Sequence, residues 1–197
     1  IITVMLNYMN FRKGDIKMNF PVLMTERLNL IEINEEHVAS IYSIFSNEEV
    51  IQYYGMSPLT SIDQAATMVK SFGNGYEQKR SMRWGIVWKE TGELIGTVGL
   101  NNLSLNSKRT EIGYELLPAH WRKGIVTEAV EAVIDYCFNE LKLFRIGAVT
   151  FPQNEASFSL LLKLGFEKEG VLKGYLYQDN ESHDAFIFSI IQPEWRK

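Results

Sequence analysis

Two spacings of apolar residues divide this chain into elements. Where every second residue is apolar the pattern predicts a β-strand, and where apolar residues recur every three or four positions it predicts an amphipathic helix. The first spacing indicates strands over 27–33, 83–89, 94–101, 110–117, 144–151, 166–177 and 182–191. The second spacing indicates helices after Asn34, from about Ile62, over 124–141 and over 155–164.

Polar residues mark where several of these elements begin or turn. Asn34 is expected to cap the first helix, and Ser61 with Gln64 has the spacing of a capping box. Gly92 supplies the positive φ of a tight hairpin, and residues 178–181 are expected to turn the last strand pair. The elements do not alternate strictly and do not repeat. We therefore expect an α/β (α+β) fold, in which helices flank a mixed, mostly antiparallel central sheet.

Length and composition predict one domain. A chain of 197 residues with 46% hydrophobic residues can fill a single core. We place the domain at 21–197 and leave 1–20 unassigned as an N-terminal extension, because Met5, Met9 and Met18 are all alternative starts. The apolar runs are too short to span a bilayer, and the first of them lacks the preceding basic residues of a signal peptide. We expect a cytoplasmic protein without membrane contact.

Charge, cysteine and histidine usage exclude other classes of chemistry. Twenty basic residues against 24 acidic ones give a net charge of −4, so nucleic acid is not an expected partner. The one cysteine, Cys137, lies on the apolar stripe of its helix and is expected to be a small hydrophobe. His37, His120 and His183 lack the spacing of a zinc site, so we expect no metal.

The segment 114–129 carries the most informative chemistry. It runs from a strand through a short basic loop into a helix, and the loop holds Arg122, Lys123 and Gly124. A helix N-terminus offers unpaired N–H groups and a partial positive charge, so a pyrophosphate could bind there. The alternative is an ordinary turn with solvated charges. The chain has neither a P-loop motif nor a GxSxG nucleophile motif, and 73–75 lacks the third glycine of a dinucleotide site.

Several motifs together carry a family resemblance. The segments 121–127, 154–157 and 164–166 resemble, in order and spacing, the GNAT superfamily of acetyl-CoA-dependent N-acetyltransferases. Three further segments, 111–114, 127–129 and 183–184, are similar to the RimJ/RimL branch, which includes ribosomal-protein N-terminal acetyltransferases. The similarity covers about 23–195. It implies acetyl-CoA as cosubstrate and direct acetyl transfer to a primary amine.

The resemblance also implies where the coenzyme binds. The strand 111–117 is expected to splay from 144–151, which would free backbone groups to pair with pantetheine. Val126 departs from the family pattern, which usually has Gly or Ala there, so we expect slightly weakened binding unless its side chain points into the core. The residues implied in coenzyme binding are Leu116, Arg122, Lys123, Gly124, Ile125, Val126, Thr127, Asn154 and Ser157.

Two residues are candidates for proton transfer. Ser157, placed by the resemblance near the coenzyme sulfur, could donate to the leaving thiolate; helix capping is the alternative, although Asn154 explains the cap better. Glu111 could accept the amine proton through water, or could be a strand-face carboxylate paired with a basic residue. Tyr175 and Tyr177 are alternative acids, for which packing in the core or in a substrate wall is the better explanation.

The acceptor is expected to be a protein N-terminal α-amine. Its pKa of about 7.7–8.0 leaves roughly a tenth neutral at pH 7, so only a weak base is needed. Tyr54 and Asp184 are candidates for contacting the acceptor, although a structural hydrogen bond explains Asp184 equally well. Two alternatives stay open: a small amine such as an amino acid, polyamine or antibiotic as acceptor, or an acyl-CoA sensor without turnover. The oligomeric state, monomer or dimer, stays open too.

Overall fold

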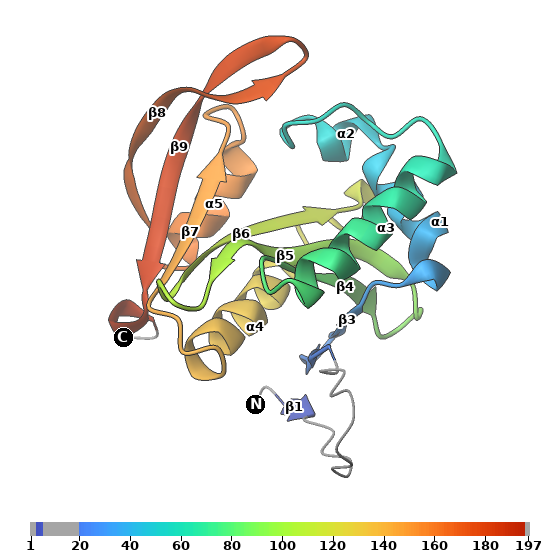
Figure 1. Ribbon diagram of the computed structural model, residues 1–197, viewed down its shortest axis with the longest axis horizontal. Coiled ribbons are helices and arrows are strands. Elements are labelled where there is room, and N and C mark those ends of the chain that lie inside the picture. Colours follow the sequence, from blue (N-terminus) through green and yellow to red (C-terminus); the bar gives the residue numbers. More distant parts are fainter. Residues whose placement is uncertain (1–2, 6–19, 196–197) are drawn as a thin grey trace.

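The computed structural model describes residues 3–5 and 20–195, and these residues form one sheet flanked by helices (Figure 1). Within them the sheet has nine strands, in the order β1-β2-β3-β4-β5-β6-β7-β9-β8. The strands are β1 (Thr3–Met5), β2 (Val22–Met24), β3 (Leu28–Glu32), β4 (Met82–Trp88), β5 (Leu94–Ser104), β6 (Arg109–Leu116), β7 (Arg145–Thr150), β8 (Glu167–Gln178) and β9 (Glu181–Ile191). All neighbours pair antiparallel except β6 and β7, which are parallel.

Helices cover both faces of this sheet, and a hydrophobic core lies under each layer (Figure 1). The helices are η1 (Glu35–His37), α1 (Val38–Phe45), α2 (Glu48–Ile51), α3 (Ile62–Glu77), η2 (Pro118–His120), α4 (Ile125–Asn139), α5 (Glu155–Lys163) and η3 (Gln192–Glu194). The larger core joins α4 and α5 to the sheet, with Trp84 and Phe188 fully buried in it. The smaller core joins α1 and α3 to the other face, around Ile41, Phe45 and Val69. The fold class expected from the apolar spacing is confirmed.

The local predictions are confirmed at most helix and strand ends. Asn34 caps η1 by accepting a hydrogen bond from the N–H of Glu36 (3.0 Å). Ser61 caps α3, but the Gln64 side chain accepts from the N–H of Thr60 instead of Ser61, so the reciprocal capping box does not form. The four-residue helix α2 was not predicted, because it is too short for apolar residues to recur at helical spacing within it.

Two further predictions concern the ends of the chain. The last hairpin turns over two residues, Asp179 and Asn180, at φ values of 54° and 64°, which suits a tight turn of the primed type. Of the extension proposed at 1–20, the structure describes only residues 3–5 and 20, and the strand 3–5 pairs with β2 at the sheet edge. The remainder of that proposal lies outside the described residues.

The sheet divides between β6 and β7. These strands are paired over three residue pairs only, from Arg109↔Arg145 to Glu111↔Gly147. Beyond that point β6 stays paired with β5 as far as Leu116, while β7 stays paired with β9 as far as Thr150. The two strands therefore diverge in a V, as expected, and each carries an unpaired edge that faces the other.

Candidate active site

The loop between β6 and α4 is shaped by two backbone positions of positive φ. Arg122 has a φ of 57° and Gly124, the N-cap of α4, has a φ of 74°. The first N–H groups of a helix have no acceptor within the helix, and Gly124 has no side chain that could cap those of α4. Arg122 and Lys123 are exposed beside them. This end of α4 has the free donors and positive charge that a phosphate requires.

Arg27, just before β3, holds this loop through its guanidinium group. Its guanidinium donates to the carbonyl oxygen of Lys123 (2.9 Å) and forms an ion pair with Glu128 in the first turn of α4 (2.6 Å). Partial burial works against the charge of Glu128, but hydrogen bonds from Thr25 and Arg27 outweigh it and lower its pKa. Glu128 therefore stays ionised, and the ion pair fixes the loop against β3.

The remaining residues of the loop and of the first turn differ in what their side chains do. Ile125 is buried in the larger core, and Val126 is packed against that core. Thr127 is half-buried. The packing of Val126 against the core fits the core-directed alternative considered from the sequence, and the side chain is half-buried.

The unpaired edges of the V fit an extended polar ligand. Thr150, at the open end of β7, is 6% exposed and its Oγ1 has no hydrogen-bond partner among the described residues. Buried polar groups are rarely left unpaired, so this hydroxyl is available to a ligand that lies beside the end of β7. The carbonyl of Leu116, at the open end of β6, already accepts a hydrogen bond from Trp121 Nε1 (2.7 Å). The residues present thus fit a coenzyme whose phosphates lie at α4 and whose chain runs into the V.

Behind the V, a pair of hydroxyl groups joins β6 to α5. Tyr114 Oη lies 2.9 Å from Ser157 Oγ, and either group can donate. The N–H of Ser157 donates to Asn154 Oδ1 (3.1 Å), so Asn154 caps α5 and the Ser157 side chain does not. Burial raises the pKa of Tyr114 to about 12, although its bond to Ser157 opposes the rise. Tyr114 is therefore a protonated donor at neutral pH. The only sequence signal for Tyr114 was its place in the segment 111–114, which is similar to the RimJ/RimL branch.

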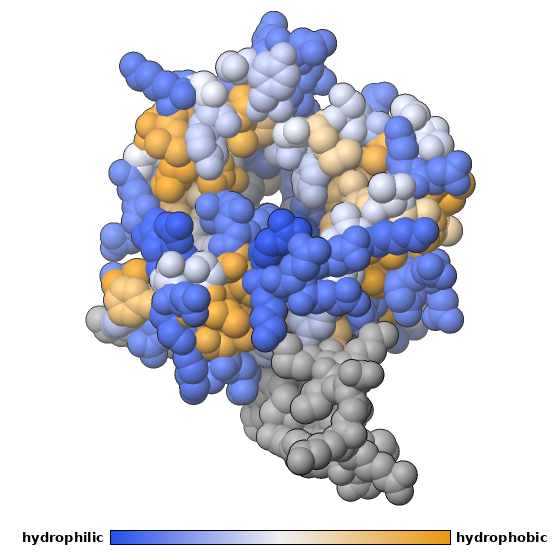
Figure 2. Space-filling model, in the orientation of Figure 1, coloured by the Kyte–Doolittle hydropathy of each residue, from blue (hydrophilic) through white to orange (hydrophobic). Residues whose placement is uncertain are grey.

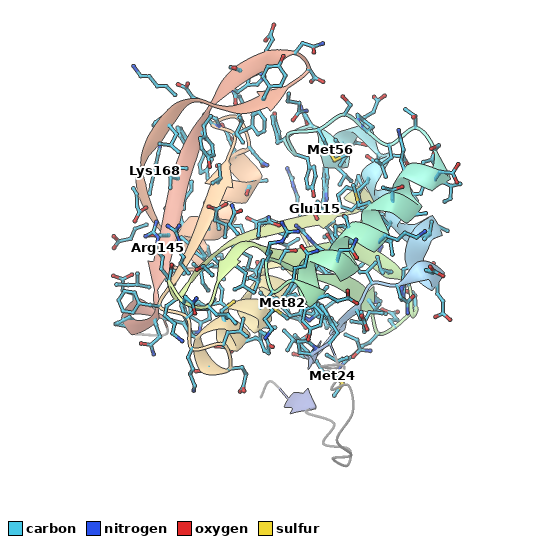
Figure 3. All side chains as sticks on the ribbon, viewed as in Figure 1. Met24, Met56, Met82, Glu115, Arg145 and Lys168 are labelled. Carbon is cyan, nitrogen blue, oxygen red and sulfur yellow. The ribbon has the colours of Figure 1, made fainter. Side chains whose placement is uncertain are left out.

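In front of the V, a buried ion pair joins β4 to β6 across the strand β5 that lies between them. Arg83 of β4 contacts Glu115 of β6 (3.1 Å), with side chains 7% and 4% exposed. Thr97 donates to the same carboxylate, and Arg83 also donates to Asn101 (3.2 Å). Burial would lower the pKa of Arg83, but Glu115 raises it, so Arg83 stays charged. Figure 3 places Glu115 near the middle of the molecule, between α3 and the β8–β9 hairpin. Sequence reasoning missed both residues.

The other predicted site residues differ in how deeply they are buried. Burial raises the pKa of Tyr54 to about 12, with Glu115 adding to the rise, so Tyr54 lies in the same electrostatic environment. Glu111, at the apex of the V, accepts a hydrogen bond from Asn102 (3.0 Å). Asp184 is exposed and accepts from the N–H of Gly174 (2.9 Å), which fits the structural alternative. Tyr175 and Tyr177 are 54% and 62% exposed, so the prediction that they pack in the core is wrong. The alternative that they form part of a substrate wall stays a prediction.

Comparison with known proteins identifies the family. Residues 27–167 match the family model described as an acetyltransferase (GNAT) domain. The chain belongs to this family. It is 48% identical over 174 residues to an uncharacterised N-acetyltransferase, YoaA, of Bacillus subtilis, which covers 88% of this chain and 98% of YoaA.

Two other similar proteins have more specific names. The ribosomal protein uS5-alanine N-acetyltransferase of Escherichia coli is 31% identical over 121 residues, covering 61% of this chain and 62% of that protein. The crystal structure of spermidine N-acetyltransferase from Vibrio cholerae, in complex with CoA and spermine, superposes with a TM-score of 0.77 at 20% identity, covering 88% of this chain and 100% of the other.

The family membership makes this protein an N-acetyltransferase with an acyl-CoA cosubstrate. Its homologues include ribosomal-protein acetyltransferases, as the resemblance to the RimJ/RimL branch implied. Among the described residues no group of three or more His, Cys, Asp or Glu side chains could hold a metal ion. The helices described in 20–195 include none that is both long and apolar enough to cross a membrane.

Reversing the loop charge should weaken coenzyme binding. We expect Arg122→Glu with Lys123→Glu to weaken acetyl-CoA binding more than tenfold, about 1.4 kcal/mol, because both cations flank the free amides of α4. Low-salt calorimetry measures this. Lys70→Glu with Lys142→Glu, at two exposed positions elsewhere, makes the same change in net charge and should have little effect. Equal affinities in the two double variants would remove the phosphate site from the loop.

Removing one member of the buried ion pair should destabilise the fold. Glu115→Leu leaves Arg83 buried without its carboxylate, and we expect the free energy of unfolding to fall by about 3–5 kcal/mol. The double variant Arg83→Met with Glu115→Leu should recover most of the loss, because no charge is then stranded. Glu169→Leu, which breaks the exposed pair with Arg145, should cost less than about 1 kcal/mol. Urea unfolding compares the three, and similar losses for both single variants would contradict the burial argument.

Proposed function

We propose that this protein transfers an acetyl group from acetyl-CoA directly to the α-amine of a protein N-terminus. The amine nitrogen bonds to the thioester carbon, the carbon–sulfur bond breaks, and the sulfur takes up a proton. The chain must therefore bind the coenzyme, remove one proton from the amine and supply one to the thiolate. Acetyl-CoA supplies the acetyl group as a reactive thioester.

The observation that carries the choice of acceptor is the engagement of Glu115. Burial raises the pKa of Glu115, but Arg83 and Thr97 both donate to its carboxylate and oppose that rise, so accepting a proton there would weaken a buried ion pair. A lysine or polyamine amine, with a pKa near 10.4, needs a strong base, whereas an α-amine with a pKa of about 7.7–8.0 needs only a weak one. The relative named as a ribosomal protein uS5-alanine N-acetyltransferase supports the same choice.

The two proton transfers are assigned to residues at the apex of the V and behind it. Glu111, at the apex of the V, accepts the amine proton through a water molecule. One of its carboxylate oxygens accepts a hydrogen bond from Asn102, and the other oxygen is the one assigned to this proton transfer. Ser157 donates its proton to the departing thiolate, and Tyr114 then donates to Ser157 across their 2.9 Å contact. The high pKa of Tyr114 keeps that second proton in place until it is needed. Residues 122–127, Leu116 and Asn154 bind the coenzyme, and Tyr54 contacts the acceptor.

The acceptor choice predicts which amine is modified and how the rate depends on pH. With acetyl-CoA and a lysine-free peptide, mass spectrometry should find acetylation of the N-terminus; an N-blocked peptide with one lysine, and spermidine, should react at least tenfold more slowly. The kcat/KM for the peptide should rise with pH and level off near the α-amine pKa of about 8, because only the neutral amine reacts.

Two outcomes would contradict this assignment. Preferred modification of spermidine would favour the small-amine alternative. This alternative is considered because the chain shares its fold with a spermidine N-acetyltransferase. Binding of acetyl-CoA without thiol release for any amine would favour the sensor.

The roles of Ser157 and Tyr114 separate catalysis from capping. We expect Ser157→Ala to lower kcat roughly 100-fold, the lower end of general-acid effects, while the acetyl-CoA dissociation constant stays unchanged. Tyr114→Phe should lower kcat less, because Ser157 keeps its proton. Neither change removes the α5 cap, whereas Asn154→Ala should cost about 0.5–2 kcal/mol of stability. Ser159→Ala, exposed on the same helix, is the matched control. A Ser157→Ala enzyme with normal kcat would sink the assignment.

A further inference from the structure

The side chain of Gln178 is fully hydrogen-bonded across the open end of the V. It is the last paired residue of β8 before the two-residue turn, and it is 9% exposed. Its amide nitrogen donates to the carbonyl oxygens of Ile51 (3.4 Å) and Gln52 (3.1 Å), and its amide oxygen accepts from the N–H of Gly55 (2.7 Å). All three partners are backbone groups of one segment, 51–55, which follows α2.

The segment 51–55 also packs against one arm of the V and interacts electrostatically with the other. The Tyr53 ring packs against Phe151, directly after β7, with ring centroids 5.9 Å apart, and Phe151 packs against His183 of β9 at 5.4 Å. The next residue, Tyr54, interacts electrostatically with Glu115 of β6 and packs edge-on against Phe45 of α1. The segment therefore runs from one arm to the other, and Gln178 ties it to the β8–β9 hairpin.

These contacts turn the open V into a closed ring. Figure 1 shows the end of the β8–β9 hairpin leaning toward α2 above the gap between the two halves of the sheet. In the space-filling view a hollow remains on this face between those halves, with hydrophilic surface along its lower rim (Figure 2). A chain that reaches the apex of the V from this face passes inside the ring.

We propose that Gln178 is a specificity-determining residue, a clasp that closes the acceptor opening into a ring and so admits the amine only at the end of a flexible, extended chain. The proposal rests on the function proposed above and narrows its substrate class. An N-terminus held close to a folded surface is excluded, because the surface meets the ring before the amine reaches Glu111. Replacing either polar atom of the Gln178 amide should weaken the clasp, because each of them has its own backbone partner.

The state of the clasp is measured by hydrogen exchange in the intact protein. In Gln178→Ala the N–H of Gly55 loses its acceptor, and we expect its exchange to become at least tenfold faster. In Gln178→Glu the carboxylate keeps an acceptor for Gly55 but faces the carbonyls of Ile51 and Gln52 without a donor. The protection factor of the Gly55 N–H, which is its intrinsic exchange rate divided by the observed rate, should therefore be lower at pH 8 than at pH 5. Gln192→Ala, at an exposed glutamine of η3, is the matched control. Unchanged exchange at Gly55 in Gln178→Ala would overturn the clasp.

Selectivity is measured with one N-terminal sequence presented in two ways. The sequence is fused to the same folded carrier so that either eight or two flexible residues separate the amine from the carrier. For the wild type we expect kcat/KM to fall at least tenfold with the shorter tether, and for Gln178→Ala to fall less than threefold, with acetyl-CoA affinity unchanged. The same tether dependence in both proteins, with faster exchange at Gly55, would overturn the role in specificity.

The two proposals fail in distinguishable ways. If the wild type acetylates small amines and no peptide, the N-terminal function fails, and the clasp is then judged with a linear diamine and its analogue branched next to the amine. A wild-type preference for the linear diamine that is lost in Gln178→Ala would retain the clasp, and an equal preference in both would overturn it.

Discussion

The divergence of β6 from β7 is the constraint on which the rest of the site depends. The two strands pair at only three positions because each continues along a different partner, β6 along β5 and β7 along β9. Backbone N–H and C=O groups inside a protein need partners, so two facing strand edges without mutual pairing form a site for an extended, amide-containing ligand. The orphaned hydroxyl of Thr150 at one of these edges is consistent with that need.

Each functional group is positioned relative to this divergence by a different part of the fold. The ion pair between Arg27 and Glu128 fixes the N-terminus of α4 against β3, at the end of the loop that leaves β6. The contact between Tyr114 and Ser157 spans from β6 to α5 behind the V. The bonds of Gln178 hold the segment 51–55 across its open end. Coenzyme and acceptor would therefore approach one point from opposite faces of the sheet.

The buried pair of Arg83 and Glu115 connects stability to chemistry. Two charges removed from water cost free energy unless they are paired and hydrogen-bonded, and here Thr97 and Asn101 complete the pairing. Burial raises the pKa of Glu115, and its contacts with Arg83 and Thr97 oppose that rise. Protonation of this carboxylate would break the pairing that makes both charges tolerable in the core.

The sequence by itself determined the elements and the sites that are local in the chain. Apolar spacing is a local property, so it predicted the longer helices and the strands from 27 onward, and the loop 122–127 was recognisable because its residues are contiguous. Asn154 and Ser157 were found for the same reason, since they lie in one helical turn. The tertiary structure alone decided the contacts between distant residues: Tyr114 with Ser157, 43 positions apart, and Gln178 with Gln52, 126 positions apart. Such pairs leave no periodic signal, because only the folded sheet brings their strands and loops together.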